Sequence, residues 1–256
     1  MSKNHLQQHA KKVFSQNGED GAIDFIFNKI GFKSKIFVEF GFGSHENNSK
    51  NLIQNYEFEG LFIDSNAVEC FRARQYYNDN IHVLNSFVTK SNINELIGSK
   101  YRGEIDFLSV DVDGVDLYLL DTIDVIQPRV VCVEYCASIG KDLSVTVHYK
   151  DDFNRHKEHK SGMYCGGSLL ANIRVMKKKG YKFIGTINGL NAFFVRDEEP
   201  MDEMSIDEGF ESHYARTYES HPRYDGTCRT MTQEEQYFTI KDLTWINVNR
   251  EGVIEI

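Results

Sequence analysis

The sequence has few of the features that mark secreted, membrane-spanning or nucleic-acid-binding proteins. It has only five cysteines and no C-x-x-C pair, which predicts reduced structural thiols and argues against a disulfide framework or a zinc site. No apolar run approaches the roughly 20 residues of a membrane-spanning helix, and the first residues lack the apolar segment of a signal peptide. The formal net charge of −9 disfavours nucleic acid or an anionic membrane as the main partner. We therefore expect a soluble, cytoplasmic protein.

Apolar runs of strand length alternate with segments of helical spacing from residue 19 onward, which predicts βαβ units around a mainly parallel sheet. The strands expected in these units are residues 35–41, 60–65, 81–88, 105–111 and 128–135. The helices are expected at residues 19–31, 48–55, 66–78, 92–98, 115–123 and 167–180. Two further strand-like runs, 181–187 and 191–196, flank an Asn-Gly pair, which is a hairpin signal. The prediction is an α/β fold with a mainly parallel seven-stranded sheet, a C-terminal antiparallel hairpin and helices on both faces.

The chain changes character after residue 197. Residues 198–256 are acidic and poorly periodic, with one or two short strands expected at 238–248. A segment of this size would be a marginal independent domain. We therefore expect residues 1–197 to form the main domain and residues 198–256 to be a cap or oligomerisation segment packed on it. If residues 198–256 are an oligomerisation segment, the protein would be a homo-oligomer.

The strand ends predict where a ligand binds, because open α/β sheets bind ligands outside the carboxyl ends of their strands. The first strand runs into VEFGFGSHENNS (38–49), in which Glu39, Gly41 and Gly43 form an acidic loop with two glycines. Glycine lets the backbone approach a ligand closely because it has no Cβ. The second strand ends at Asp64, a place that suits hydrogen bonds to ribose hydroxyls. Asp64 is alternatively a helix N-cap.

The glycine loop also bears on which adenosine-type cofactor is bound. The dinucleotide fingerprint requires a third glycine, but Gly43 is followed by Ser44, His45 and Glu46. A carboxylate at Glu46 would oppose a pyrophosphate at the helix N-terminus. A cofactor with a sulfonium and an ammonium group tolerates nearby carboxylates such as Glu39. The loop therefore favours S-adenosylmethionine over NAD.

Seven segments in order resemble the FkbM-type family of S-adenosylmethionine-dependent methyltransferases. They are SQNGEDGAI (15–23), VEFGFGSHENNS (38–49), GLFIDS (60–65), IDFLSVDVDG (105–114), QPRVVCVEY (127–135), GGSLLANIRVMKKKGYKFIG (166–185) and NAFFVR (191–196). The resemblance covers roughly residues 14–197. It implies a class I methyltransferase (Rossmann-like) fold and methylation of a hydroxyl, often on a sugar or natural product.

The resemblance also implies positions along the cofactor. Glu39 and Gly41, with Gly43 in the same loop, would lie along its methionine part, and Asp64 at its ribose. Other members of the predicted cofactor site are Asn85 and Ser86 near the adenine, Ser15 and Gln16 in a segment closing over the cofactor, and Asp111 facing the transferable methyl.

Carboxylates gather after the fourth and fifth predicted strands. Transfer to a sugar hydroxyl needs a general base or a Lewis acid, because the pKa of the hydroxyl lies far above 7. Our hypothesis is that Asp111 and Glu134 ligate Mg²⁺ or a similar ion and that Asp113 or His148 takes the proton. A metal-free site with the same base is the first alternative. In the second, Asp113 caps the helix expected from residue 115 and Asp116 is only a first-turn residue.

Basic residues follow the fifth predicted strand, in the loop HYKDDFNRHKEHKSG (148–162). They form either a solvated face or a clamp in which Arg155 and Lys157 hold an anionic acceptor, such as the diphosphate of a nucleotide-activated sugar. His213, Arg216 and Arg223 would contribute only if the C-terminal extension folds back.

Together these observations predict an S-adenosylmethionine-dependent O-methyltransferase. Its expected acceptor is a small molecule, a sugar or nucleotide-activated sugar (for example a heptose), made for bacterial capsule or another surface polysaccharide. The alternatives are an NAD-dependent sugar-modifying oxidoreductase and a catalytically silent methyltransferase-like binding module.

Overall fold

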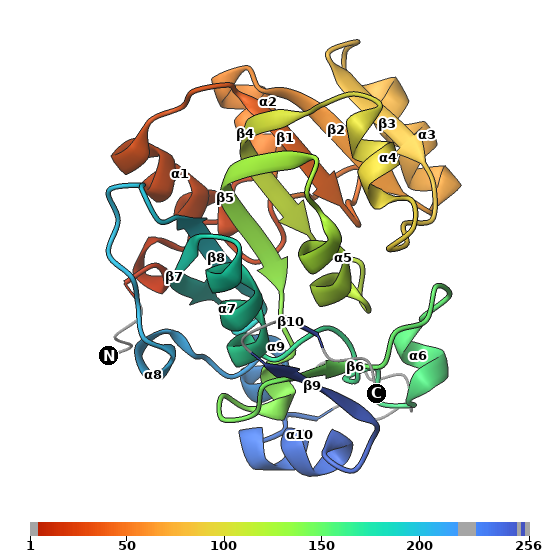
Figure 1. Ribbon diagram of the computed structural model, residues 1–256, viewed down its shortest axis with the longest axis vertical. Helices are drawn as coiled ribbons and strands as arrows, with labels where there is room; N and C mark the ends of the chain where they lie inside the picture. Colours follow the sequence, from red (N-terminus) through yellow and green to blue (C-terminus); the bar gives the residue numbers. More distant parts are fainter. Residues whose placement is uncertain (1–4, 220–228, 250–251, 254–256) are drawn as a thin grey trace.

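The computed structural model describes residues 5–219, 229–249 and 252–253. Its main feature is a seven-stranded sheet in the order β3-β2-β1-β4-β5-β8-β7 (Figure 1). The strands are β1 (Ile36–Phe40), β2 (Glu59–Asp64), β3 (Ile81–Asn85), β4 (Gly103–Val110), β5 (Ile126–Glu134), β7 (Tyr181–Ile187) and β8 (Asn191–Arg196). The first five are parallel, and β8 pairs antiparallel with both β5 and β7. This is the class I methyltransferase arrangement of a Rossmann-like sheet, and it confirms the predicted fold.

Helices cover both faces of the sheet, as predicted. Alternate residues of β1 point to opposite sides, so Phe37 joins one apolar cluster while Val38 and Phe40 join the other. The Phe37 side is covered by α1 (Glu19–Ile30), α2 (Lys50–Tyr56) and α3 (Ala67–Tyr76). The other side is covered by α4 (Ile93–Gly98), α5 (Asp116–Thr122) and α7 (Leu169–Lys178). Burial on both faces explains the near-continuous apolar strands.

The antiparallel hairpin forms where the Asn-Gly pair predicted it. Asn188 and Gly189 both have positive φ values, 53° and 61°, as the two central residues of a type I′ turn require. The predicted strand at 81–88 ends earlier, at Asn85, and the remaining residues leave the sheet to line a pocket described below.

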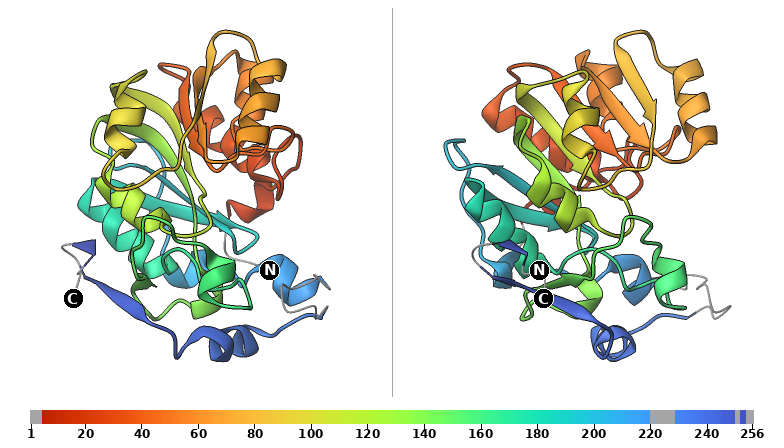
Figure 2. Two further views of the ribbon diagram at one scale, coloured as in Figure 1. Left: turned by 90° about the vertical axis from the view of Figure 1, so that its right-hand side faces the viewer. Right: turned by 45° about the vertical axis from the view of Figure 1, so that its right-hand side comes forward.

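A second, smaller sheet was not predicted. It joins β6 (Val145–Val147) to β9 (Trp245–Asn249) and β10 (Gly252–Val253), all antiparallel. The region 238–248, predicted as strand, is divided between the end of α10 (Gln233–Ile240) and β9. Figures 1 and 2 place this sheet and α10 beneath the tips of β4 and β5.

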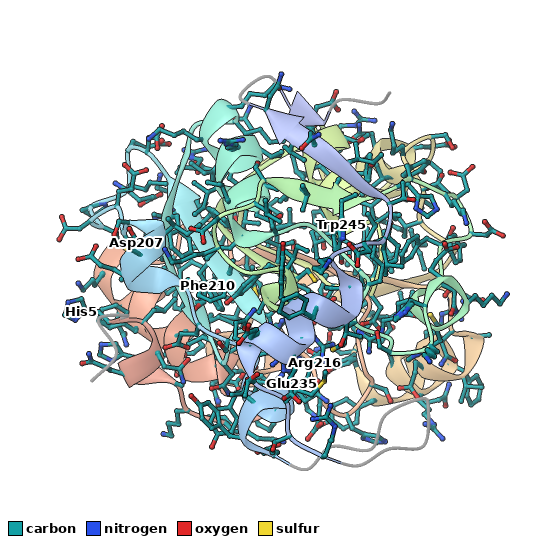
Figure 3. The ribbon with its side chains drawn as sticks, turned by 90° about the horizontal axis from the view of Figure 1, so that it is seen from below. His5, Asp207, Phe210, Arg216, Glu235 and Trp245 are labelled. Atoms are coloured by element: carbon teal, nitrogen blue, oxygen red, sulfur yellow. The ribbon has the colours of Figure 1, made fainter. Side chains whose placement is uncertain are left out.

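The C-terminal extension packs on the main domain through buried polar contacts. The Gln236 side chain accepts a hydrogen bond from the hydroxyl of Ser138, and both residues are fully buried. Gln233 donates to the carbonyl of Ala137, in the short 3₁₀ helix η2 (Ala137–Ile139). The remaining short helices are η1 (Gln7–His9), α6 (Arg155–Glu158), α8 (Ile206–Gly209) and α9 (Tyr214–Tyr218). Seen from below, the extension covers the underside of the molecule (Figure 3).

One buried ion-pair network ties the extension to the sheet. The Arg129 guanidinium of β5 is fully buried and lies 2.9 Å from a carboxylate oxygen of Asp106 and 2.7 Å from one of Glu199. It also donates to the carbonyls of Ile30 and Gly31, at the end of α1. A buried charge with this many partners is satisfied.

The cysteines and the helices agree with the expectations from composition. Four cysteines, Cys70, Cys132, Cys136 and Cys165, are buried free thiols, whereas Cys228 lies outside the described residues. Within the described part of the chain, no helix combines the length and apolar composition needed to cross a bilayer.

Candidate active site

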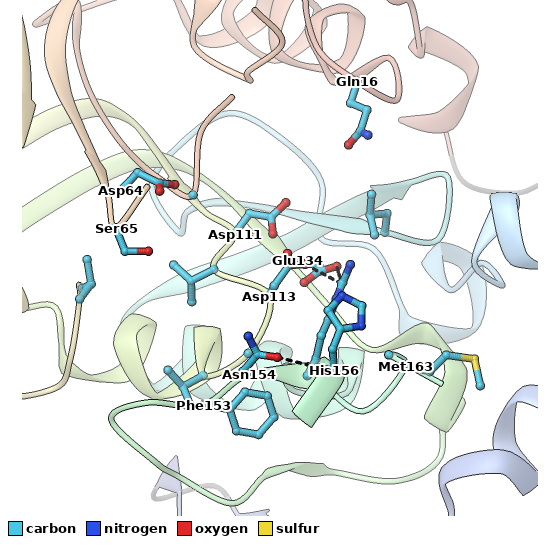
Figure 4. Close-up of a pocket in the computed structure, with 18 of the residues that line it drawn as sticks. Gln16, Asp64, Ser65, Asp111, Asp113, Glu134, Phe153, Asn154, His156 and Met163 are labelled. Atoms are coloured by element: carbon cyan, nitrogen blue, oxygen red, sulfur yellow. Dashed lines mark hydrogen bonds and ion pairs between the residues drawn. The ribbon is translucent and has the colours of Figure 1, made fainter. Parts of the chain in front are cut away.

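A pocket of about 760 Å³ opens at the carboxyl ends of the parallel strands (Figure 4). Its walls include Gly41 after β1, Asp64 at the end of β2, Asp111 after β4 and Glu134 at the end of β5. The strand order reverses between β1 and β4, and this switch point is where open α/β sheets bind ligands. The pocket therefore lies where the sequence predicted it.

Asp64 is positioned by the turn between β2 and α3. Its carboxyl accepts the backbone N–H of Asn66 at 2.6 Å and points into the pocket (Figure 4). Burial raises the pKa of this half-buried carboxyl above its ordinary value. The alternative that Asp64 caps the helix is wrong, because Asn66 is the N-cap of α3 and its side chain accepts from two backbone N–H groups. The carboxyl of Asp64 is thus available to the pocket.

The glycine loop is shaped by packing against the end of β4. Gly41 has a φ of 71°, and a Cβ at this position would lie 1.4 Å from the carbonyl oxygen of Asp111. Only glycine allows the two strand ends to approach this closely. Gly41 also lines the pocket, whereas Gly43 does not. Glycine at position 41 is therefore required by the packing of the two strand ends, in addition to the predicted close approach of a ligand.

Glu39 is buried beneath this loop and is not part of the pocket lining. Its two carboxylate oxygens accept the backbone N–H groups of Asn48 at 3.0 Å and Ser49 at 2.8 Å, just before α2. Burial nevertheless raises its pKa to about 7. The contacts of Glu39 and Gly43 with the methionine part of a cofactor stay predictions.

The N-terminal segment reaches the pocket through Gln16, which lies across it from Asp64 (Figure 4). The preceding residue, Ser15, is buried instead and donates its hydroxyl to Asp20 at 2.8 Å. The same Asp20 oxygen accepts three successive backbone N–H groups, at residues 13–15. Asp20 thus holds this segment in place, and Gly18 takes the N-cap position of α1.

After β3, Ser86 lines the pocket, and its contact with an adenine stays a prediction. Phe87, which is 50% exposed, also lines the pocket. Asn85 does not line it; its side chain donates to the backbone carbonyl of Asp64 at 2.9 Å. An exposed aromatic ring at a pocket wall is a surface on which a flat ring can stack. No local signal marked Phe87 as a pocket residue, because it belongs to the run 81–88 that was predicted as strand.

Three carboxylates meet in the pocket where β4 and β5 end. Asp111, Asp113 and Glu134 each offer an oxygen within 4.8 Å of the others. Burial, followed by the neighbouring negative charges, raises the pKa of Glu134 to about 8 and that of Asp111 well above its ordinary range. Among the described residues, the buried Oε2 of Glu134 has no hydrogen-bond partner. This group therefore needs positive charge or protons from elsewhere.

Asp116 is separate from this group, as expected. It is the first residue of α5, is fully buried, and accepts the backbone N–H groups of Val112 at 2.6 Å and Gly114 at 2.9 Å. The alternative that Asp113 caps this helix is wrong, because the N-cap position is Val115 and carries no side-chain cap bond. Asp113 has a φ of 57°, a strained value for a non-glycine residue that is typical of functional sites.

The basic loop contributes one arginine to the carboxylates. Arg155, in α6, lies 2.5 Å from Asp113 and 3.8 Å from Glu134. Lys157 and His148 are not in the pocket lining. The Nδ1 of His148 lies 3.0 Å from the hydroxyl of Tyr164. The structure thus brings together Asp113 and Arg155 of the predicted catalytic and acceptor-binding residues, and separates His148 and Lys157 from the site.

The C-terminal extension also contributes residues to the pocket lining. Its residues there are His213, Arg216 and Arg229, and the neighbouring loop adds His156. Arg216 is held by a hydrogen bond from its guanidinium to Ser138 at 3.2 Å. The sequence allowed for His213 and Arg216 if the extension folds back, but no local signal pointed to Arg229; Arg223 lies outside the described residues.

No protein-family model matches the chain, and no curated protein matches its sequence. One similar solved structure, from Galdieria sulphuraria, is described as a sarcosine dimethylglycine methyltransferase; it is 15% identical with a TM-score of 0.42, over 64% of this chain and 60% of that one. The N-terminal domain of EvdMO1 with SAH bound is 11% identical with a TM-score of 0.44, over 72% and 82% of the two chains. The methyltransferase domain of bacterial CtHen1-C is 15% identical with a TM-score of 0.42, over 70% and 96%. These likenesses concern the fold alone.

Proposed function

We propose that the protein is an S-adenosylmethionine-dependent O-methyltransferase of the FkbM type. One observation carries the proposal: a single pocket at the switch point is lined by Asp64 and Ser86 and by a group of three carboxylates. Its volume of about 760 Å³ is within the range of small-molecule sites. Asp64 and Ser86 suit a nucleoside, and the three carboxylates suit the removal of a proton from an acceptor.

The residues present fit the cofactor. The Asp64 carboxyl would accept hydrogen bonds from the ribose hydroxyls, and Ser86 with Phe87 would contact the adenine. Gln16 would close over the opposite side. Bound S-adenosylmethionine supplies an electrophilic methyl group on a sulfonium. The half-buried Asp111 lines the same pocket and would face that positive charge.

Within the proposal, Asp113 is the general base. It is the most exposed of the three carboxylates, with a side chain that is 57% exposed, so an acceptor hydroxyl can reach it. Arg155 pairs with Asp113 at 2.5 Å and so helps to position its carboxylate. Glu134, whose pKa is raised by burial, holds a proton more readily and would bind the acceptor by hydrogen bonds.

A divalent cation is the second form of the proposed site. Asp111 and Glu134 are the residues that would hold Mg²⁺, and a hard cation there would lower the pKa of an acceptor hydroxyl. Carboxylate oxygens within reach of one another fit such an ion. The guanidinium of Arg155 already lies beside these carboxylates, however, so it would compete with Mg²⁺ for their oxygens.

The acceptor class is proposed from the resemblance and from the polar walls. Carboxylates, Asn154 and Arg155 around the open end suit a polyhydroxylated ligand, and an arginine suits a phosphate. We infer a sugar, nucleotide-activated, destined for a surface polysaccharide and methylated in the cytoplasm. The extension would act as a cap over this acceptor, and a role in oligomerisation stays a second possibility for it.

The deciding experiment is calorimetric titration with S-adenosylhomocysteine and, separately, with NAD. We expect micromolar binding of the first and none of the second. Product formation is then assayed with a panel of nucleotide sugars, with and without Mg²⁺. The Asp113→Asn variant should lower kcat at least 100-fold and leave S-adenosylhomocysteine affinity within threefold. The matched His148→Gln variant, outside the pocket, should stay within fivefold of the wild type. Binding of NAD alone would favour the oxidoreductase, and binding of neither would favour a silent module.

A further inference from the structure

The acidic group at the strand ends already contains a cation of the protein's own. Asp111, Asp113 and Glu134 offer oxygens within 4.8 Å of one another, close enough to repel strongly if all are charged. The guanidinium of Arg155 lies among them, with Nη1 at 2.5 Å from Asp113 and 3.8 Å from Glu134. A divalent ion bound by these oxygens would have to share the same space.

The loop that carries Arg155 is seated on the strand ends. Phe153 is buried and packs on Gly114, where an added Cβ would lie 2.6 Å from the phenyl ring. Asn154 then caps α6 by accepting the backbone N–H groups of His156 and Lys157. These contacts fix the backbone on both sides of Arg155, and its side chain is 24% exposed. The arginine is therefore held over the carboxylates by its own loop.

A second pocket arginine makes the position of Arg155 distinctive. Arg216 also lines this pocket and brings a second positive charge to it. Among the described residues, however, Arg216 makes no ion pair with the acidic group, and its guanidinium bonds to Ser138. The lining thus holds further arginines, Arg216 and Arg229, but of Arg155 and Arg216 only Arg155 lies between the carboxylates.

We propose that Arg155 is the resident cation of this site and takes the place of a divalent metal ion. The acidic group is then a latent metal site, which Arg155 keeps closed to hard cations. The guanidinium satisfies Asp113 and approaches Glu134, and a divalent ion cannot reach both carboxylates without displacing it. The inference builds on the acidic site of the proposed function and selects its metal-free form, but its test measures metal binding and needs no methyl transfer.

The test is a titration with Mn²⁺ followed by electron paramagnetic resonance, with Mg²⁺ as competitor. Wild-type protein should bind Mn²⁺ weakly, and Arg155→Gln should bind it at least tenfold more tightly. The matched Arg216→Gln variant removes a positive charge from the same pocket, and it should stay within threefold of the wild type. Adding Glu134→Gln to Arg155→Gln should remove the gain. Calorimetry with S-adenosylhomocysteine and circular dichroism report separately on the cofactor site and the fold.

Three results would overturn the inference. Mn²⁺ binding to wild type as tight as to Arg155→Gln would show that the arginine does not close the site. A variant that is folded yet gains no affinity would show that the carboxylates are not a latent metal site. An equal gain in Arg216→Gln would show that only the total charge matters. If Arg155→Gln fails to fold, the wild type still decides: tight Mn²⁺ binding, or activity lost on exhaustive chelation, contradicts the proposal.

Discussion

The buried carboxyl of Glu39 should make the stability of this fold depend on pH. Glu39 is 3% exposed, and burial raises its pKa from 4.5 to about 7, against the opposing effect of hydrogen bonds from Ser49 and Asn48. In the unfolded chain the same group ionises near its ordinary value. Between pH 4.5 and about pH 7, Glu39 loses its proton in the unfolded state but keeps it in the folded state. The free energy of unfolding therefore falls as pH rises through this range.

The size of the effect follows from the two pKa values. The difference between 4.5 and about 7 corresponds to about 3 kcal/mol of unfolding free energy, at about 1.4 kcal/mol per pH unit. This contribution is fully present below about pH 4.5, is lost progressively up to about pH 7, and stays constant above it. Relaxation of the loop around the ionised group would reduce the loss.

The perturbation is Glu39→Gln, which removes the titration and keeps an oxygen that can accept one of the two N–H groups. Urea unfolding of both proteins from pH 4.5 to 8 should show the wild type losing about 3 kcal/mol relative to the variant by pH 7, and no further relative change above it. The control is Glu46→Gln, at a side chain that is 50% exposed and paired with Lys12. Stability curves of wild type and Glu39→Gln that run parallel across this range would refute the reasoning.

Two further changes test how the strand ends and the sheet are held. Gly41→Ala should cost at least about 3 kcal/mol, because an added Cβ would lie 1.4 Å from the Asp111 carbonyl oxygen and φ is positive. Gly43→Ala should cost clearly less, because its Cβ would lie 2.8 Å from the Glu46 carbonyl oxygen and φ is not positive. Equal losses in thermal unfolding would contradict this. Arg129→Met should cost about 3–5 kcal/mol in urea unfolding because two buried carboxylates lose their partner, and a loss below about 1 kcal/mol would show that they are not charged.

The main sheet could be predicted from sequence because its strands are buried on both faces and read as apolar runs. The hairpin was equally predictable, since Asn188 and Gly189 carry a local turn signal. The second sheet could not be predicted in this way. Its strand β6 has three residues, and its partner β9 lies about a hundred residues further along the chain, so no local periodicity marks the pair.

The residues of the candidate site likewise fall into those that local sequence predicts and those that only long-range contacts bring to the pocket. Asp64, Asp111 and Glu134 follow apolar strands directly, and parallel strand ends meet at one edge, so their convergence could be predicted. Arg216 reaches the pocket only because the extension folds back onto η2, a contact between segments far apart in the chain. His148 was misplaced for a related reason, because its direction depends on how the loop after β6 turns.

Hydrogen-bond donors separate the acidic residues at this edge into two kinds. Glu39 and Asp116 are buried, and each accepts two backbone N–H groups, so each closes a loop that starts a helix. Among the described residues no backbone N–H bonds to the carboxyl of Asp111 or Glu134, although burial affects both. A carboxyl group that accepts backbone N–H groups in this way holds a loop in place. Asp111 and Glu134, without backbone donors beside the pocket, are the carboxyls to which the proposed function assigns a role toward a ligand.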